Sequence, residues 1–212
     1  MRTVRFVIVA VICAVCFIAS RAQLTDAEKS AVRISSDYEV SDNITYKVAN
    51  SYEAKLDVYR PREAKTPTPV VVMIHGGGWV FGTKESKVLD SLPFMTMGFA
   101  VVNVEYRLGK TSLAPAVVED CLCALHWVGR NAKKYNFDLS KVVVTGGSAG
   151  GHLAVTTSMI PFSAGFENER AYEDDETWDG PWKDQRPKVA AVINGFGITD
   201  VSDMLQGPNI RA

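Results

Sequence analysis

The sequence predicts an α/β fold in which a mostly parallel sheet carries helices on both faces. Four short runs are almost continuously apolar and β-branched, as parallel strands covered on both faces are: residues 69–74, 99–106, 141–145 and 189–194. Stretches with helical character separate these runs, and strands that alternate with helices form parallel sheets with right-handed crossovers. The composition, 47% hydrophobic and 22% charged over 212 residues, suits one globular domain.

The N-terminal segment differs from the rest of the chain. Two arginines precede an apolar stretch of 14 residues, FVIVAVICAVCFIA, and small residues follow at Ser20 and Ala22. This order is typical of a secretory signal peptide. We therefore expect residues 1–22 to be a signal peptide and residues 23–212 to form the domain, secreted or periplasmic and without stable membrane association. A retained N-terminal anchor is the alternative, although the apolar stretch is short for spanning a bilayer.

Charge and cysteine content argue against several partner classes. The formal net charge is −1, and no basic cluster with interleaved aromatic residues occurs, so we expect no nucleic-acid partner. Outside residues 1–22 the cysteines are Cys121 and Cys123, which would point about 200° apart on a helix and should not bridge each other. We expect neither a metal nor a cofactor.

The first elements surround a glycine-rich loop. Residues 44–60 alternate around a polar turn at Asn50 and Ser51, which predicts an antiparallel pair of strands. The apolar run 69–74 runs directly into HGGGW (75–79), and a helix is expected over residues 85–97.

The later elements surround a second glycine-rich turn. After the strand 99–106, Pro115 opens a helix over residues 115–134. The strand 141–145 then leads into TGGSAGGH, a helix over 149–160 follows, and the excursion 161–187 before the last strand suggests a functional insertion or a surface loop.

The two glycine-rich segments do not fit nucleotide-binding fingerprints, because a required glycine is missing from each. GGSAG (146–150) instead matches G-x-S-x-G between a strand and a helix, the context of a nucleophile elbow. Ser148 is therefore the expected nucleophile. Its attack on a carbonyl would create an oxyanion, and we expect the backbone N–H groups of Gly77, Gly78 and Ala149 to receive that charge.

These motifs give the chain its resemblance to a known superfamily. From about residue 40 onward it resembles the α/β-hydrolases, and within them the hormone-sensitive-lipase-like and feruloyl-esterase-like carboxylesterases, through LDVYRP, HGGGWVFGTK, GFAVVNVEYRL, KVVVTGGSAGGHLA and VINGFGITD. The resemblance implies a carboxylesterase-type serine hydrolase that forms an acyl-enzyme on Ser148, and the expected signal peptide would make it a secreted one. It also implies small-molecule or polysaccharide ester substrates, among them plant polysaccharide acetyl or feruloyl esters.

The base and acid of a catalytic triad are not evident. In this superfamily they follow the nucleophile in the order Asp or Glu, then His, whereas the histidines here are His75, His126 and His152. We expect all three to be structural, and Asp200 is only a weak candidate for the acid. We therefore expect the chain to be an N-terminal fragment that lacks the last strands, with acid and histidine beyond residue 212, and to be almost inactive alone.

Two other functions stay open at this point. A catalytically inactive α/β-hydrolase fold could bind a small molecule, although the intact serine and both glycine segments argue against it. A serine peptidase of the same fold would generally carry a large additional N-terminal domain.

Overall fold

The computed structural model describes residues 25–161, 164 and 186–201, and a six-stranded sheet is its central element. The strand order is β1-β2-β4-β3-β5-β6. The strands are β1 (Tyr38–Ala49), β2 (Tyr52–Pro61), β3 (Thr68–Ile74), β4 (Ala100–Val104), β5 (Phe137–Gly147) and β6 (Val189–Gly195). β1 pairs antiparallel with β2, and β2 with β4, whereas β3, β4, β5 and β6 run parallel. The predicted mostly parallel sheet is confirmed.

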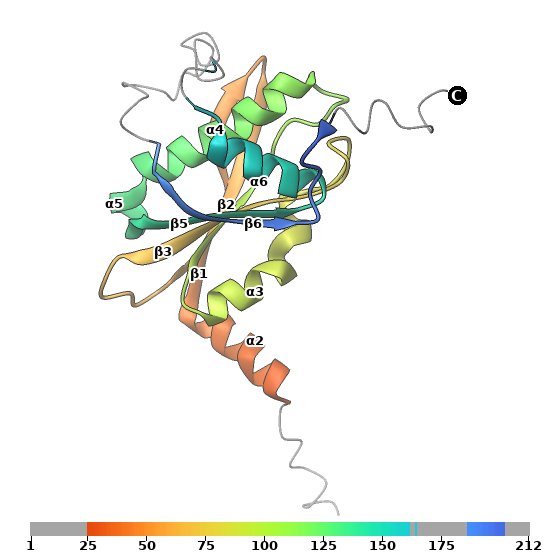
Figure 1. Cartoon of the computed structure of the whole chain (residues 1–212). Coiled ribbons are helices and arrows are strands. Elements are labelled where there is room, and N and C mark those ends of the chain that lie inside the picture. The colour runs from red at the N-terminus through yellow and green to blue at the C-terminus, as the bar shows by residue number, and fades with distance from the viewer. Residues whose placement is uncertain (1–24, 162–163, 165–185, 202–212) are drawn as a thin grey trace, which may run out of the picture. The chain divides into compact units, whose positions relative to one another are not determined.

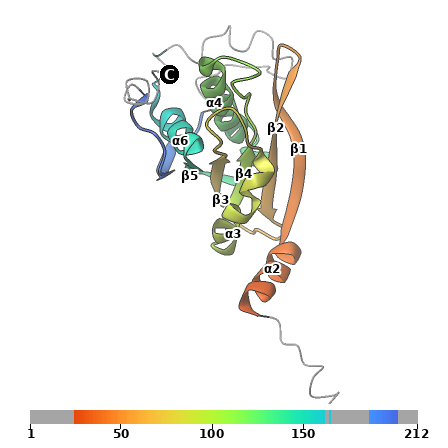
Figure 2. The same cartoon turned by 90° about the vertical axis from the view of Figure 1, so that its right-hand side faces the viewer.

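Helices cover both faces of this sheet. They are η1 (Lys84–Lys87), α3 (Val88–Thr96), α4 (Ala114–Arg130), α5 (Ala132–Tyr135) and α6 (Ala149–Met159). Figures 1 and 2 show α4 and α6 over one face and α3 over the other. The helix expected over 115–134 is divided into α4 and α5 at Asn131, whose side-chain amide donates to the carbonyl of Trp127 and closes the last turn of α4.

A further helix, α2 (Asp26–Asp37), belongs to a separate N-terminal unit and was not predicted. Its start carries a capping box, because the Thr25 hydroxyl accepts from the Glu28 N–H and the Glu28 carboxylate accepts from the Thr25 N–H. The T-x-x-E pattern at Thr25 is the sequence signal that could have located it.

The central strands are buried on both faces, as their unbroken apolar runs predict. Every residue of β4 is buried, and Val70 to Ile74 of β3 are at most 3% exposed. The face under α4 and α6 forms the main hydrophobic core, to which α4 contributes Leu122 and Leu125. This packing fixes the carboxyl ends of β3 and β5, where the two glycine-rich segments begin.

The two outer strands of the sheet differ from each other. β1 carries charged residues and two register irregularities, between Ser41 and Ile44 and between Thr45 and Lys47. β6 has the sequence VAAVING, and Val192 and Ile193 are 37% and 47% exposed. The expectation that residues 189–194 form a strand is confirmed. The expectation that both faces of this strand are buried is wrong, because most of its residues are exposed in the described part of the chain.

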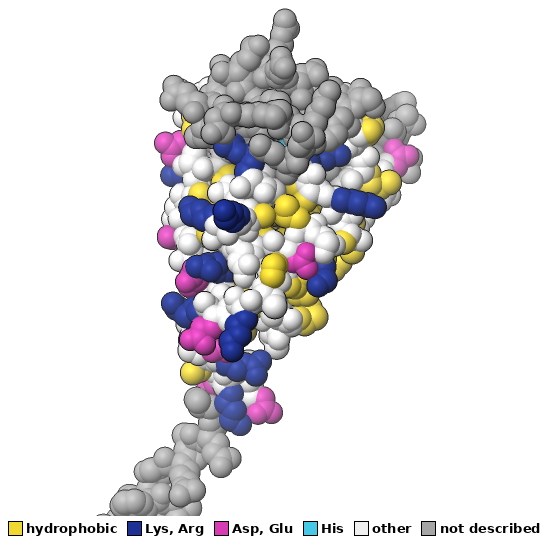
Figure 3. Space-filling model, turned by 90° about the vertical axis from the view of Figure 1, so that its left-hand side faces the viewer, with side chains coloured by type: hydrophobic (Ala, Val, Ile, Leu, Met, Phe, Trp, Pro, Cys, Tyr) yellow, Lys and Arg dark blue, Asp and Glu magenta, His cyan; other side chains and the backbone are white. Residues whose placement is uncertain are grey.

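Several expectations fall outside the described ranges. The predicted signal peptide lies there entirely, as does most of the stretch 161–187. Among the helices that can be described, none has the length and apolar character needed to cross a bilayer. Figure 3 shows one face of the molecule, on which basic and acidic side chains are scattered among hydrophobic ones.

Candidate active site

Ser148 lies at the sharp turn between β5 and α6 with φ +55° and ψ −122°. A side-chain-bearing residue in such a conformation costs about 1–3 kcal/mol and persists only where its surroundings hold it. Two backbone hydrogen bonds do so here. The Ser148 N–H donates to the carbonyl of Gly195 at 2.8 Å, and its carbonyl accepts from the His152 N–H at 3.1 Å. The end of β6 therefore helps to hold the serine in its strained geometry.

The glycines two residues on either side of Ser148 are required by space. A β-carbon at Gly150 would lie 2.2 Å from the carbonyl oxygen of Ile74 and 2.6 Å from that of His75. One at Gly146 would lie 2.4 Å from the carbonyl of Gly150. These separations are too short for any side chain, so the turn can pack against the end of β3 only with glycine at both positions.

Residues 75–84, which we call the HGGGW loop, leave β3 beside this turn. A β-carbon at Gly76 would lie 3.6 Å from Cβ of Ser148 and 2.6 Å from the carbonyl oxygen of Gly147. Gly77, Gly78 and Trp79 follow with φ of +120°, +57° and +62°. Glycine adopts positive φ without a steric penalty, whereas Trp79 does so at a cost, and these angles bend the loop back sharply. The two glycine-rich segments therefore meet at one edge of the sheet.

The expected oxyanion donors are chain neighbours of the residues that meet at this junction. Gly77 and Gly78 directly follow the residue that packs against Ser148, and Ala149 is the first residue of α6. In the described part of the chain, no backbone hydrogen bond is donated by the N–H groups of Gly77, Gly78 or Ala149. The Ala149 N–H also lies at the positive end of the α6 dipole. Such groups are suited to bind a negative oxygen.

His75 supports the HGGGW loop from within the protein. Its side chain is fully buried, its Nδ1 donates to the carbonyl of Gly76 at 2.7 Å, and its ring stacks on Tyr106 with centroids 4.2 Å apart. A β-carbon at Gly82 would lie 2.7 Å from this Nδ1, so the loop closes tightly around the imidazole. His75 is thus a packing residue of the loop, as the sequence suggests.

The other two histidines also have structural surroundings. His152 lies on α6 and presents an edge-on contact to Trp79, with ring centroids 5.3 Å apart. His126 is fully buried in α4. No hydrogen bond joins the Ser148 hydroxyl to His75, His126 or His152, all of which the structure describes. Asp200 is exposed beyond the end of β6.

Because of its buried histidines, we expect the stability of the fold to depend on pH. Burial lowers the pKa of His75 and of His152 below the ordinary value of 6.5, although the Gly76 carbonyl opposes this for His75. Because the unfolded chain then binds protons more readily, both groups stabilise the fold above about pH 6.5 and lose that contribution as the pH falls. We expect the urea midpoint to drop between pH 7.5 and 6.0, and to drop less in His152→Gln. Equal pH dependence of the two proteins would contradict this role for His152.

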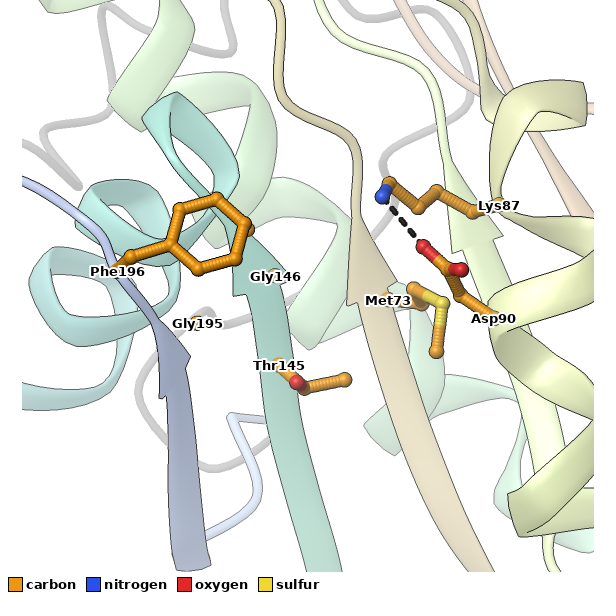
Figure 4. Close-up of a pocket in the computed structure, with 8 residues that line it drawn as sticks. Met73, Lys87, Asp90, Thr145, Gly146, Gly195 and Phe196 are labelled. Carbon is orange, nitrogen blue, oxygen red and sulfur yellow. Dashed lines mark hydrogen bonds and ion pairs between the residues drawn. The ribbon is translucent and has the colours of Figure 1, made fainter.

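A cavity of about 200 Å³ opens next to the serine turn. Figure 4 shows its lining, in which Phe196 and Met73 face each other across Thr145 and the ion pair of Lys87 and Asp90 forms one wall. Gly147, the residue before Ser148, also lines it, and the ring of Phe196 lies 3.4 Å from where a β-carbon on Gly147 would be. Phe196 is 87% exposed. Sequence reasoning did not single out Phe196 or this cavity.

The topology, the strained serine between strand and helix, and the adjoining HGGGW loop define an α/β-hydrolase fold. The BD-FAE family model matches residues 56–211. The chain therefore belongs to the BD-FAE family.

Proteins of known name agree with this assignment. The chain is 36% identical over 114 residues to carboxylesterase NlhH of Mycobacterium tuberculosis, covering 51% of this chain and 34% of that protein. It is 32% identical over 110 residues to an arylesterase of Saccharolobus solfataricus, covering 51% and 36%. Both alignments thus span about a third of the relative.

Two solved structures extend the comparison to the fold. Esterase 2 of Thermogutta terrifontis with bound propionate matches 82% of this chain and 59% of its own with a TM-score of 0.63 and 25% identity. A bacterial heroin esterase matches 74% of this chain and 46% of its own with a TM-score of 0.55 and 30% identity.

Proposed function

We propose that the chain supplies the nucleophile and the oxyanion hole of a serine carboxylic-ester hydrolase. The observation that carries this proposal is the contact between the two glycine-rich segments, in which the β-carbon position of Gly76 lies 3.6 Å from Cβ of Ser148. An ester carbonyl carbon at the Ser148 hydroxyl would place its oxygen near the N–H groups of Gly77, Gly78 and Ala149. The carboxylesterase and arylesterase relatives support the same chemistry.

The proposed reaction has two steps. The Ser148 oxygen attacks the ester carbon and gives up its proton to a base, and the carbonyl oxygen becomes negative. The carbon–oxygen bond to the alcohol then breaks, and the alcohol leaves with the proton from the base. Water repeats the sequence on the acyl-enzyme and releases the acid. Each oxyanion donor would contribute roughly 3 kcal/mol to the barrier reduction.

We also propose that none of the three histidines is this base. His75 and His126 are fully buried, and His152 packs against Trp79. By itself the chain should therefore turn esters over very slowly.

Covalent labelling tests the serine mechanism without requiring turnover. A fluorophosphonate probe should modify Ser148 slowly, and added imidazole should accelerate the reaction by acting as an external base. Peptide mapping by mass spectrometry should find the label on residue 148 in the native protein and no comparable site in Ser148→Ala. The described serine Ser112 is a control, because it lies outside both glycine-rich segments. Labelling that does not favour Ser148 over Ser112 would contradict the proposal.

The same experiment separates the second candidate, a catalytically inactive small-molecule binding protein. The observation in its favour is that the Ser148 hydroxyl is not hydrogen-bonded to the ring of any of the three histidines, all of which lie in the described part of the chain. A binding protein would bind esters reversibly and leave Ser148 unlabelled with or without imidazole.

For substrate and location, we propose acyl esters of plant polysaccharides, acted on outside the cytoplasm. The N-terminal pattern of residues 1–22 supports export.

A further inference from the structure

We propose that Glu105, Tyr106 and Arg107 form a clamp that positions the HGGGW loop for oxyanion binding. These three residues directly follow β4, and each makes a side-chain contact with a different element. The proposal rests on the proposed function insofar as the clamped loop carries oxyanion donors. The clamp itself is argued from the contacts alone.

Tyr106 holds the first residue of the loop. Its hydroxyl donates to the carbonyl of His75 at 2.9 Å, and its ring stacks on the His75 ring with an interplanar angle of 12°. The side chain is fully buried, and this burial raises the pKa of the phenol, so that it stays protonated and remains a donor. One side chain thus fixes both the backbone and the ring of His75.

Glu105 holds the last residue of the loop. Its carboxylate accepts from the backbone N–H of Lys84 at 2.7 Å. The buried Lys84 ammonium also forms an ion pair with Asp57 on β2 at 3.0 Å, so Lys84 is held through both its backbone and its side chain. The backbone of Glu105 is held in turn, because its carbonyl accepts from the Tyr46 hydroxyl at 2.7 Å.

Arg107 anchors the clamp to α4. Its guanidinium donates twice to the carboxylate of Asp120, at 2.8 Å and 2.7 Å, and its backbone N–H donates to the same carboxylate at 2.9 Å. Asp120 is fully buried and also pairs with Lys47 of β1 at 3.2 Å. A planar guanidinium bonded through two atoms leaves little freedom of rotation.

The loop between the two fixed ends has little conformational preference of its own. Gly77, Gly78 and Gly82 all have positive φ, and glycine is the residue with the most backbone freedom to lose. Donors for an oxyanion act well only when they are already oriented before the charge forms. Fixing residues 75 and 84 to one rigid tripeptide supplies that orientation from outside the loop.

Hydrogen exchange of the backbone tests the clamp in the chain itself. In Tyr106→Phe, which keeps the ring, the loop amides of Val80 and Phe81, which donate to the Gly77 carbonyl, should exchange about fivefold to tenfold faster, the effect of losing one ordinary hydrogen bond. Tyr38→Phe is the matched control, because the Tyr38 hydroxyl also donates to backbone carbonyls, those of Met95 and Phe99, away from the loop. It should leave residues 76–84 unchanged.

Glu105 provides a second variant pair that does not disturb the core. Glu105→Ala should accelerate the same amides, and Glu105→Gln, which keeps an acceptor for the Lys84 N–H, should restore slow exchange. Unchanged exchange over residues 76–84 in both Tyr106→Phe and Glu105→Ala would overturn the clamp. So would an equal acceleration in Tyr38→Phe.

The labelling reaction of Ser148 shows whether the clamp serves the oxyanion site. With imidazole and a fluorophosphonate, Tyr106→Phe should lower the maximal labelling rate about tenfold, the order of effect expected of a misplaced donor, while the half-saturating probe concentration stays the same. A purely structural contact would leave the maximal rate unchanged, and that result would overturn the positioning role. If Ser148 is never labelled but exchange rises as expected, the esterase proposal fails and the clamp stands.

Discussion

Residues 1–212 are expected to hydrolyse p-nitrophenyl acetate about a million-fold more slowly than a serine esterase with a complete triad. Removing the base of such a triad has an effect of this order, because the nucleophile, base and orienting acid act as one unit. The oxyanion donors would still be present, so a residual rate above the reaction in water is consistent with this expectation.

The expectation follows from where the histidines lie. His75 already uses Nδ1 on the carbonyl of Gly76 and is buried under Tyr106. His152 sits four residues after the nucleophile on the same helix and contacts Trp79. The imidazole of neither is hydrogen-bonded to the Ser148 hydroxyl, and His126 is enclosed in α4.

Steady-state release of p-nitrophenol at pH 7.5 measures this, with Ser148→Ala as the background. The native protein and the variant should release product at nearly equal rates. Robust turnover that depends on Ser148 would show that one of the three histidines is the base after all. His152→Ala would then be the first variant to examine, because His152 is the only one of the three that follows the nucleophile.

Gly150→Ala is expected to destabilise the protein by about 3 kcal/mol or more, the upper range for overpacked sites. Helix propensity alone predicts the opposite sign, because alanine inside a helix is favoured over glycine by about 1 kcal/mol. The steric term should win, since the new β-carbon would lie 2.2 Å from the carbonyl oxygen of Ile74 and 2.6 Å from that of His75. Both neighbours are backbone atoms of a central strand and its continuation, so they cannot move aside cheaply.

Urea unfolding of the two proteins measures this difference. Gly98→Ala is a useful control, because Gly98 has φ +85° but no atom within 4 Å of its β-carbon position. Its cost should be only that of the left-handed conformation, about 1–2 kcal/mol. A Gly150→Ala protein as stable as the native one would mean that the turn can separate from β3, and the contact between the two glycine-rich segments would lose its significance.

The strands and the serine turn could be predicted because their signals are local. An unbroken run such as residues 69–74 is what a doubly covered parallel strand needs, and G-x-S-x-G leaves few other structures for Ser148. The start of β5 was placed too late. The strand begins at Phe137 because Phe137 and Asp138 pair with Thr68 and Pro69, a partnership that no local pattern reveals.

The supporting contacts of the site could not be predicted for the same reason. Lys84 meets Asp57 across 27 positions of sequence, and the Ser148 N–H meets the carbonyl of Gly195 across the end of β6. Such pairs form only after the sheet has assembled, and a single sequence does not indicate which distant residues will be in contact. Arg107 and Asp120 lie 13 positions apart in the sequence, and no local pattern links them to the HGGGW loop.

The two edge strands of the described sheet, β1 and β6, differ in how readily they can pair with another molecule. On the β1 side, irregular register and charge discourage a neighbouring molecule from continuing the ladder of hydrogen bonds. On the β6 side, an uncharged strand with exposed Val192 and Ile193 offers its backbone to any extended peptide of compatible sequence. Among the described strands, β6 is therefore the edge at which molecules are expected to associate, and the yield of monodisperse protein should fall as the protein concentration rises.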